Sequence, residues 1–437
     1  MVAQCLYGAD INPMAIEMCK LSLWLVSLDP KQPFSFVDDK MLVGNSLLGI
    51  TDLAQLEALH IDPTRVPPEE ALFDVTSAGY ASTVDVRGTV AKAVRIRHTL
   101  ASEVDDNDPQ RSAKAKKVQL ERLRRTTDEL RDIADGVIAA GLGLGGKPGK
   151  ALDEAYDNLR LAVNDAYPSH GDQNRARLEA IQDVGLTPTV QTDYERWMPL
   201  HWAIELPDIC VRDGFDAVIG NPPFLVGKKI SGAIGVAHRE YLVNQIADSR
   251  TGNSDMVAFF VIRATSLLRP TGCLGLVTAK VISEGDTREV GLEQLALRGF
   301  RIHRAVRSRE WPSRGTVATR YSIVWGGWRD QRTAAFLDDV AVRHITPSLE
   351  PASRVSGTPI RLLENRGECF KGFDFGGKGF LMSQEEAEAM ILEDCRNRDV
   401  LFTYLNGRDL NSSPHLASIF HWWSDDGRTV GCPLVCC

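Results

Sequence analysis

The sequence predicts an α/β protein whose sheet is interrupted by a helical insertion. Two short apolar segments, residues 5–9 and 215–219, each lead into a polar residue, as parallel strands do at a ligand crevice. Residues 51–196 lose the alternation of strand and helix, and their amphipathic stretches predict helices. We therefore expect one sheet built from two separated parts of the chain.

The composition is that of a folded protein. The 437 residues correspond to roughly two to four domains. Hydrophobic residues make up 43% and charged residues 25%, which excludes wholesale disorder. The net charge of −8 excludes a histone-like polycation but not a nucleic-acid partner, because such binding needs only a basic face.

Targeting and metal-binding signals are missing from the sequence. No apolar run is long enough for a transmembrane helix and no signal peptide is present, so we expect a cytoplasmic protein with no membrane partner. The nine cysteines show no paired CxxC spacing, which predicts reduced thiols and no metal site.

The first strand is followed by Asp10 and then by a helix start. Asn12 and Pro13 are typical of an N-cap and a first helical residue. A carboxylate at a strand end can accept both hydroxyls of a ribose, whereas the alternative is an Asp that interacts with the helix dipole. One apolar stripe of the helix is expected to pack inward: Met14, Met18, Leu21, Leu25 and Leu28.

A second strand is predicted at residues 40–43, and Asn45 follows its end, although a simple turn is the alternative. In the insertion we expect helices at residues 116–138 and 151–166. The glycine-rich linker 141–149 lacks the GxxxxGK[ST] pattern of a phosphate loop. Because the charge of the insertion is mixed, we expect a solvated helix pair rather than a nucleic-acid arm.

The strongest motif is Asn221-Pro222-Pro223-Phe224, directly after the strand at 215–219. Each residue before a proline is held extended, so the loop is stiff. It offers two neighbouring acceptors, which suit an amino group with two hydrogens, and Phe224 offers a face for a planar base. The alternative is a rigid turn with a core phenylalanine.

Two further segments follow this motif. A helix is predicted at 255–268, with Ser254 as its cap, and Asp255 stands at its start; a strand is expected at 273–279. Residues 298–332 are sharply basic and include Arg307, Arg309 and Arg314, which are candidates for phosphate contacts. The alternative is a pair of strands, 301–306 and 317–325, with exposed charges.

Four motifs, in the family's order, resemble those of amino-group methyltransferases that use S-adenosylmethionine. They are residues 6–13 with 23–25, residues 44–47, residues 198–206 and residues 221–224. The third motif is similar to that of large adenine-specific DNA methyltransferases, including the type IIG restriction–modification branch, and residues 404–411 resemble the entry to a target-recognition region. The resemblance covers most of residues 5–50 and 198–420.

This resemblance implies a Rossmann-like, S-adenosylmethionine-dependent methyltransferase that methylates adenine N6 at specific sites in double-stranded DNA. The amide oxygen of Asn221 and the carbonyl of Pro222 would bind the N6 hydrogens of a flipped adenine, and Phe224 would stack on the base. Asp10, beside Ile11, would hold the cofactor ribose. Asn45 would contact the cofactor adenine, with Asn221 also bordering the cofactor and Asp255 near the site.

The resemblance also divides the chain and leaves alternatives open. Residues 1–50 and 198–345 would form the methyltransferase domain, 51–197 the insertion, and 346–437 a linker with the start of a target-recognition region. The family's glycine-rich cofactor loop has no counterpart, which predicts a sheet incomplete at its N-terminus. We expect a restriction–modification or phage-defence system with a nuclease or specificity partner, separate or fused. The alternatives are an inactive remnant that binds only DNA or a partner, and a methyltransferase of RNA or protein glutamine.

Overall fold

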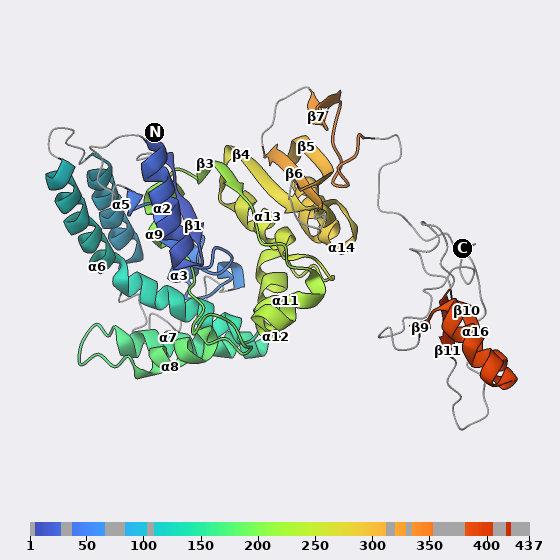
Figure 1. The fold of residues 1–437 in the computed structure, drawn as a ribbon. Coiled ribbons are helices and arrows are strands. Elements are labelled where there is room, and N and C mark those ends of the chain that lie inside the picture. Colours follow the sequence, from blue (N-terminus) through green and yellow to red (C-terminus); the bar gives the residue numbers. More distant parts are fainter. Residues whose placement is uncertain are drawn as a thin grey trace. The chain divides into compact units, whose positions relative to one another are not determined.

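The structure is a computed structural model that divides into two compact units, Met1–Val355 and Ser356–Cys437, which are described separately (Figure 1). The described residues are 5–27, 37–65, 84–102, 109–311, 320–328, 334–352, 381–404 and 417–420. None of their helices is long and apolar enough to span a membrane.

The first unit contains strands from both ends of its sequence. They are β1 (Gly8–Asp10), β2 (Met41–Val43), β3 (Phe215–Gly220), β4 (Leu268–Ala279), β5 (Arg301–Glu310), β6 (Arg320–Gly327), β7 (Ala335–Leu337) and β8 (Val340–Val342). The strands at 5–9, 40–43, 215–219 and 273–279 and the pair at 301–306 and 317–325 are thus confirmed, with shifted ends.

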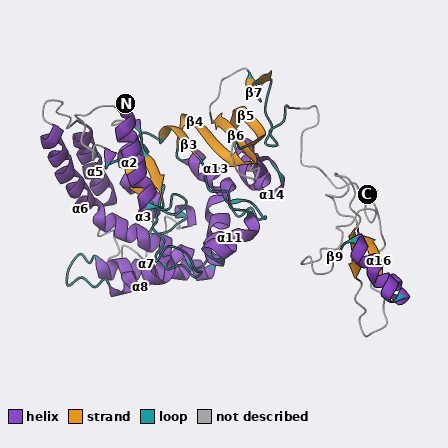
Figure 2. Cartoon of the chain, in the orientation of Figure 1, coloured by secondary structure: helices purple, strands orange, loops and turns teal. Residues whose placement is uncertain are grey.

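The helices of this unit lie before, between and after the strands (Figure 2). They are α2 (Pro13–Ser27), α3 (Leu53–Glu57), η2 (Pro63–Arg65), α5 (Val86–Ser102), α6 (Pro109–Leu142), α7 (Lys150–Ala166), α8 (Ala176–Leu186), α9 (Trp202–Glu205), α10 (Pro207–Cys210), α11 (Gly227–Ile234), α12 (Val236–Tyr241), η3 (Leu242–Ile246), α13 (Met256–Ser266), η4 (Lys280–Ser283), α14 (Gly285–Arg288), η5 (Glu289–Glu293) and α15 (Gln294–Leu297).

The strands form two ladders, which make the first unit an α/β fold with a mixed sheet. β1 and β2 pair in parallel, with Asp10 opposite Val43. The other six strands have the order β3-β4-β6-β5-β7-β8, in which β3–β4 and β5–β7 are parallel and the remaining pairs antiparallel. The two ladders share an apolar cluster, in which the rings of Tyr7 and Phe215 lie 5.8 Å apart, edge to face.

Helix α2 begins as predicted, but it buries a different face. The Asn12 side-chain oxygen accepts the Met14 N–H at 2.9 Å, so Asn12 is the cap before Pro13. The predicted inward stripe is wrong for its described members, because Met14 is 66% exposed and Met18 63%; Leu21 and Leu25 are exposed too, and Leu28 lies outside the described residues. The helix packs through Ile16, Cys19, Leu23 and Trp24 against Val37 and Met41.

Strand β3 is less buried than its apolar sequence predicts. Ile219 is 84% exposed, and Asp216, Ala217 and Gly220 are exposed as well. The reason is topological, because β3 is the edge strand of the six-stranded ladder in the described structure and pairs only with β4 there.

The insertion is helical, as predicted, and α6 is its longest element. The carboxyl-terminal half of α6 packs against α7 and α8 in one apolar core, to which Leu130, Ile138, Tyr156, Leu159 and Leu178 contribute. The amino-terminal half packs against α5 through Ala93, Ile96, Leu100 and Leu123. Figure 1 shows α5 and α6 side by side.

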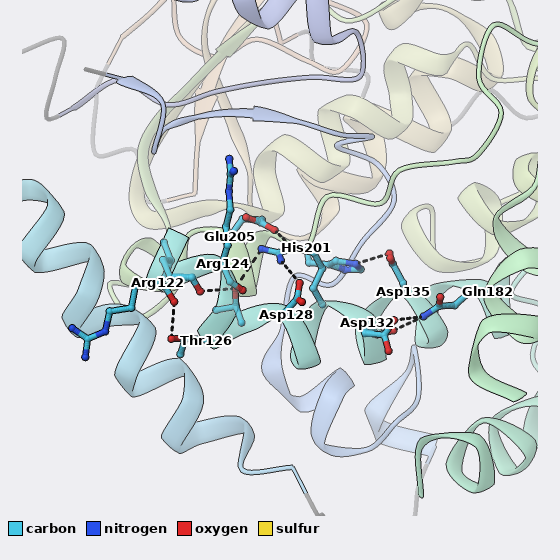
Figure 3. A network of polar contacts seen from close by, with 12 residues as sticks. Arg122, Arg124, Thr126, Asp128, Asp132, Asp135, Gln182, His201 and Glu205 are labelled. Atoms are coloured by element: carbon cyan, nitrogen blue, oxygen red, sulfur yellow. Dashed lines mark hydrogen bonds and ion pairs between the residues drawn. The ribbon is translucent and has the colours of Figure 1, made fainter. Parts of the chain in front are cut away.

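Polar contacts attach α6 to the segment before β3. The buried His201 ring accepts the Ile50 N–H at Nδ1, at 3.2 Å, and therefore carries its proton on Nε2, which lies 3.1 Å from Asp135 (Figure 3). One turn earlier, Arg131 Nε donates to Glu205 Oε1 at 2.8 Å. Helix α5 is attached in the same way, because the buried Arg97 pairs with Asp208 of α10.

Substituting His238 of α12 is expected to change how stability depends on pH. The imidazole is buried against the Trp197 ring at 4.8 Å, and burial lowers its pKa from 6.5 to about 4. The unfolded chain therefore takes up a proton below pH 6.5 that the folded chain resists. The free energy of unfolding should fall by up to about 1.4 kcal/mol per pH unit between pH 6.5 and 4 because of this group.

The measurement is thermal unfolding of the wild type and of His238→Leu between pH 7 and 4. The variant should lose this share of the acid sensitivity, so the difference in Tm between the two proteins should narrow as the pH falls. A constant difference over that range would contradict the prediction. His170, which is exposed, provides the matched control as His170→Leu.

The second unit has one helix and a small sheet. Its elements are β9 (Leu381–Met382), α16 (Gln384–Glu393), η8 (Cys395–Asp399), β10 (Leu401–Tyr404) and β11 (Ala417–Phe420). The helix start predicted at Ser383 is confirmed, because Ser383 and Glu386 form a capping box. β11 lies between β10 and β9 and pairs antiparallel with both. Most of residues 404–411, resembling the entry to a recognition region, lie outside the described residues.

Candidate functional site

The Asn221–Phe224 loop lies between β3 and α11. Asn221 is exposed, Pro222 is buried, Pro223 is exposed, and the Phe224 ring is 39% exposed. The Pro223 carbonyl accepts the Leu225 N–H at 3.2 Å. Within the described part of the chain, the Asn221 amide and the Pro222 carbonyl make no hydrogen bond. The two acceptors that the sequence predicts are therefore both free to bind a ligand.

The loop is supported from behind by the start of α13. Met256 N–H donates to the Leu225 carbonyl at 3.0 Å. Gly227, the first residue of α11, passes so close to the preceding segment that a Cβ atom there would lie 2.4 Å from the Asn253 carbonyl oxygen. A side chain at position 227 would thus push the loop away from α13.

Asp255 is the cap of α13, which corrects the prediction of Ser254. Its Oδ1 accepts the Val257 N–H at 3.1 Å, and its own N–H donates to Thr287 Oγ1 at 3.0 Å. The residue is 3% exposed, and burial raises the pKa of its carboxyl group while the Val257 N–H opposes that shift. Asp255 takes the cap because its extended backbone places its oxygen over the first free N–H groups, and it lies one residue from the contact with Leu225.

A second group of predicted residues meets at the carboxyl ends of β1 and β2. The parallel register brings Asp10 beside Val43, and Gly44 N–H donates to the Asp10 carbonyl at 2.9 Å. Ile11 and Asn45 follow directly on the two strands. The Asp10 carboxylate is exposed, and its Oδ1 accepts the Asn12 N–H at 2.7 Å. The Asn45 oxygen accepts the Leu47 N–H at 3.0 Å, which leaves its NH₂ group as a donor.

Tyr194 joins this group, and the sequence analysis missed it. The segment that leads to β3 crosses the end of β2, where Asn45 N–H donates to the Met198 carbonyl at 2.6 Å and Asn45 bridges Pro199 in parallel. The pKa of Tyr194 is raised by burial and by the negative charges of Asp10 and Asp193. Nothing in the sequence links Tyr194 to Asp10, because only the fold brings the two together.

The predicted basic residues lie elsewhere. Arg307 and Arg309 are on β5, which β4 and β6 separate from β3, and Arg314 lies outside the described residues. Arg307 Nε lies 3.0 Å from Asp338 Oδ2, and Arg309 lies 3.6 Å from Asp339. Both charges thus have intramolecular partners, which the sequence analysis did not foresee.

Three relatives resemble the chain. A Methanocaldococcus jannaschii protein named as a type II restriction enzyme and methyltransferase is 25% identical over 304 residues, 64% of this chain but 22% of its own length. The chain thus spans about a fifth of that relative. The type IIL restriction–modification enzyme MmeI, solved with DNA, matches with a TM-score of 0.39 and 14% identity, over 70% of this chain and 47% of that one. The type IIG restriction endonuclease BpuSI matches with a TM-score of 0.21 and 11% identity, over 68% and 40%.

A family model decides the assignment. The model of the Eco57I restriction–modification methylase matches residues 4–306, which is more than half of the chain and includes both groups of site residues. The chain therefore belongs to the Eco57I restriction–modification methylase family.

Proposed function

We propose that this methylase transfers a methyl group from S-adenosylmethionine to the N6 atom of adenine in duplex DNA, in the cytoplasm and within a restriction–modification system. The observation that carries the proposal is the pair of free acceptors at the end of β3, the Asn221 amide oxygen and the Pro222 carbonyl. An exocyclic amino group has two hydrogens to donate to such a pair. Because the two acceptors are adjacent on a stiff loop, they hold the nitrogen in one orientation.

The target base must leave the double helix to reach this loop, since the amino group of a paired adenine is engaged in the stack. Phe224 presents part of its ring to solvent next to the acceptors and would stack on the flipped base. Donation of both N6 hydrogens to Asn221 and Pro222 raises the electron density on nitrogen. The lone pair is then directed at the methyl group, and alignment supplies most of the rate enhancement.

The residues at the ends of β1 and β2 fit the nucleoside part of the cofactor. S-adenosylmethionine supplies a methyl group bound to a sulfonium. The exposed Asp10 carboxylate keeps one oxygen uncommitted among the described residues, which suits the ribose hydroxyls. The Asn45 NH₂ group faces no acceptor there and can donate to a ring nitrogen of adenine, with Ile11 beside it. Tyr194, next to Asp10, would border the same site.

The test is methyl transfer from labelled S-adenosylmethionine to unmethylated duplex DNA, followed by digestion to nucleosides and mass spectrometry. Label in N6-methyladenine is the expected result. Label in a methylated cytosine, or saturable cofactor binding without any transfer to DNA, would contradict the proposed reaction. Failure to bind the cofactor at all would instead support an inactive remnant.

A further inference from the structure

Helices α5 and α6 carry a concentration of exposed positive charge that the mixed composition of the insertion conceals. In their described residues up to position 125, the acidic residues are reduced to Glu121. The exposed basic side chains of this helix pair, which we call the basic helix pair, are Lys92, Arg95, Lys114, Lys117, Arg122, Arg124 and Arg125.

These seven side chains have no acidic partner within the described part of the chain. Figure 3 shows the Arg122 guanidinium pointing away from the polar network, which reaches this residue only through its carbonyl, the acceptor of Thr126 Oγ1 at 2.8 Å. The arginines of β5 differ, because Asp338 and Asp339 neutralise them. In the same helices, Arg87 and Arg97 do have partners, Glu57 and Asp208.

The charge sits where helix energetics disfavour it. The first turn of α6 contains no acidic residue, and cations near a helix N-terminus oppose the dipole by about 0.3–1 kcal/mol each. Lys114 and Lys117 are also three residues apart, so they repel one another on the same face. A surface that keeps unfavourable charges is explained most simply by an anionic partner.

The same charges line a groove of about 870 Å³ that runs towards the site. Lys114, Lys117 and Arg124 recur at helical spacing along one wall, and the opposite wall includes Ile16 of α2 and Val43 of β2. The acidic groups of that opposite wall are already paired, since Lys20 binds Glu17 and Asp38. The groove therefore has a net positive wall, and it reaches Val43, the residue paired with Asp10.

The basic helix pair is also firmly positioned. The Arg97–Asp208 pair fixes α5, while the Arg131–Glu205 and His201–Asp135 contacts fix α6 just beyond the basic stretch. A surface attached in this way keeps its geometry relative to the ends of β1 and β2, as phosphate contacts that set the register of a substrate require.

We infer that the basic helix pair binds the phosphate backbone of the duplex DNA substrate, outside the catalytic loop. This inference rests on the proposed DNA substrate and adds a second contact surface to it. Contacts of this kind position the duplex without reading its sequence, so they set affinity and salt dependence rather than the choice of base.

The test compares three charge removals on the basic helix pair with three elsewhere on the insertion. The first variant is Lys114→Gln, Lys117→Gln and Arg124→Gln; the matched control is Lys147→Gln, Lys150→Gln and Arg177→Gln, which changes the net charge equally at exposed positions on and near α7 and α8. Binding of a labelled duplex oligonucleotide is followed by fluorescence anisotropy between about 50 and 200 mM NaCl.

We expect the first variant to bind about tenfold or more weakly, with a slope of log Kd against log[salt] smaller by about three, one for each lost contact. The control should keep the wild-type slope. Equal losses in both variants, or an unchanged slope in the first, would overturn the inference, as would the same loss for duplex RNA without measurable DNA binding. Because binding is measured without catalysis, a protein that shows the slope change but no methyl transfer refutes the proposed reaction alone.

Discussion

Asn221→Ala is expected to lower the rate of methyl transfer to duplex DNA by about a hundredfold or more, because a misplaced reacting group costs that much. The amide oxygen is one of the two acceptors at the end of β3, and no other described group replaces it. Single-turnover incorporation of labelled methyl groups measures the effect directly.

The same substitution should leave the fold and the binding steps intact. The Asn221 side chain is exposed and makes no hydrogen bond within the described structure, so its removal costs little stability. Asn158→Ala, at an exposed position on α7, is the matched control and should retain full activity. More than a tenth of the wild-type rate in Asn221→Ala would show that this amide is not the acceptor that orients the amino group.

Arg97→Met is expected to lower the free energy of unfolding by about 3–5 kcal/mol, which is the usual cost of leaving one partner of a buried ion pair uncompensated. Arg97 is buried, pairs with Asp208, and also donates to the Asp39 carbonyl at 3.2 Å. Its loss leaves the Asp208 charge mostly buried and detaches α5 from the segment before β3. Thermal unfolding followed by circular dichroism gives the change in Tm.

Two further variants test the cause of that loss. Arg95→Met removes an exposed arginine from the same helix and should shift the free energy of unfolding by at most about 0.5 kcal/mol. Adding Asp208→Leu to Arg97→Met removes the stranded charge, and the double variant should recover much of the lost stability. A double variant less stable than Arg97→Met would rule out the buried charge as the source of the effect.

Local patterns predicted those features that depend on neighbours in sequence. The strands before Asp10 and Asn221, the Asn12 cap and the Ser383 capping box depend on residues within a few positions of each other, and the structure has them all. Helix α2 was harder, since apolar residues occupy more than one of its faces and periodicity alone cannot choose which face packs. The placing of Ser254 as a cap instead of Asp255 is an error of one residue at a helix boundary.

Features that depend on tertiary contacts could not be predicted. The pairing of Arg307 with Asp338 follows from the parallel contact of β5 with β7, and the proximity of Tyr194 to Asp10 follows from a loop that crosses β2. The charge of the insertion is mixed only as a sum. The fold turns the acidic Asp132 and Asp135 of α6 towards Gln182 and His201 and leaves the basic residues of its first half in solvent.

The exposed stripe of α2 also governs how the protein behaves at high concentration. Met14, Met18, Leu21 and Leu25 present adjacent apolar side chains to water, and a contiguous patch of this kind promotes self-association. At low ionic strength the net charge of −8 keeps molecules apart, whereas physiological salt screens that repulsion beyond about 8 Å. Colloidal stability and DNA affinity should therefore both decline as salt is added, so binding titrations belong at dilute protein.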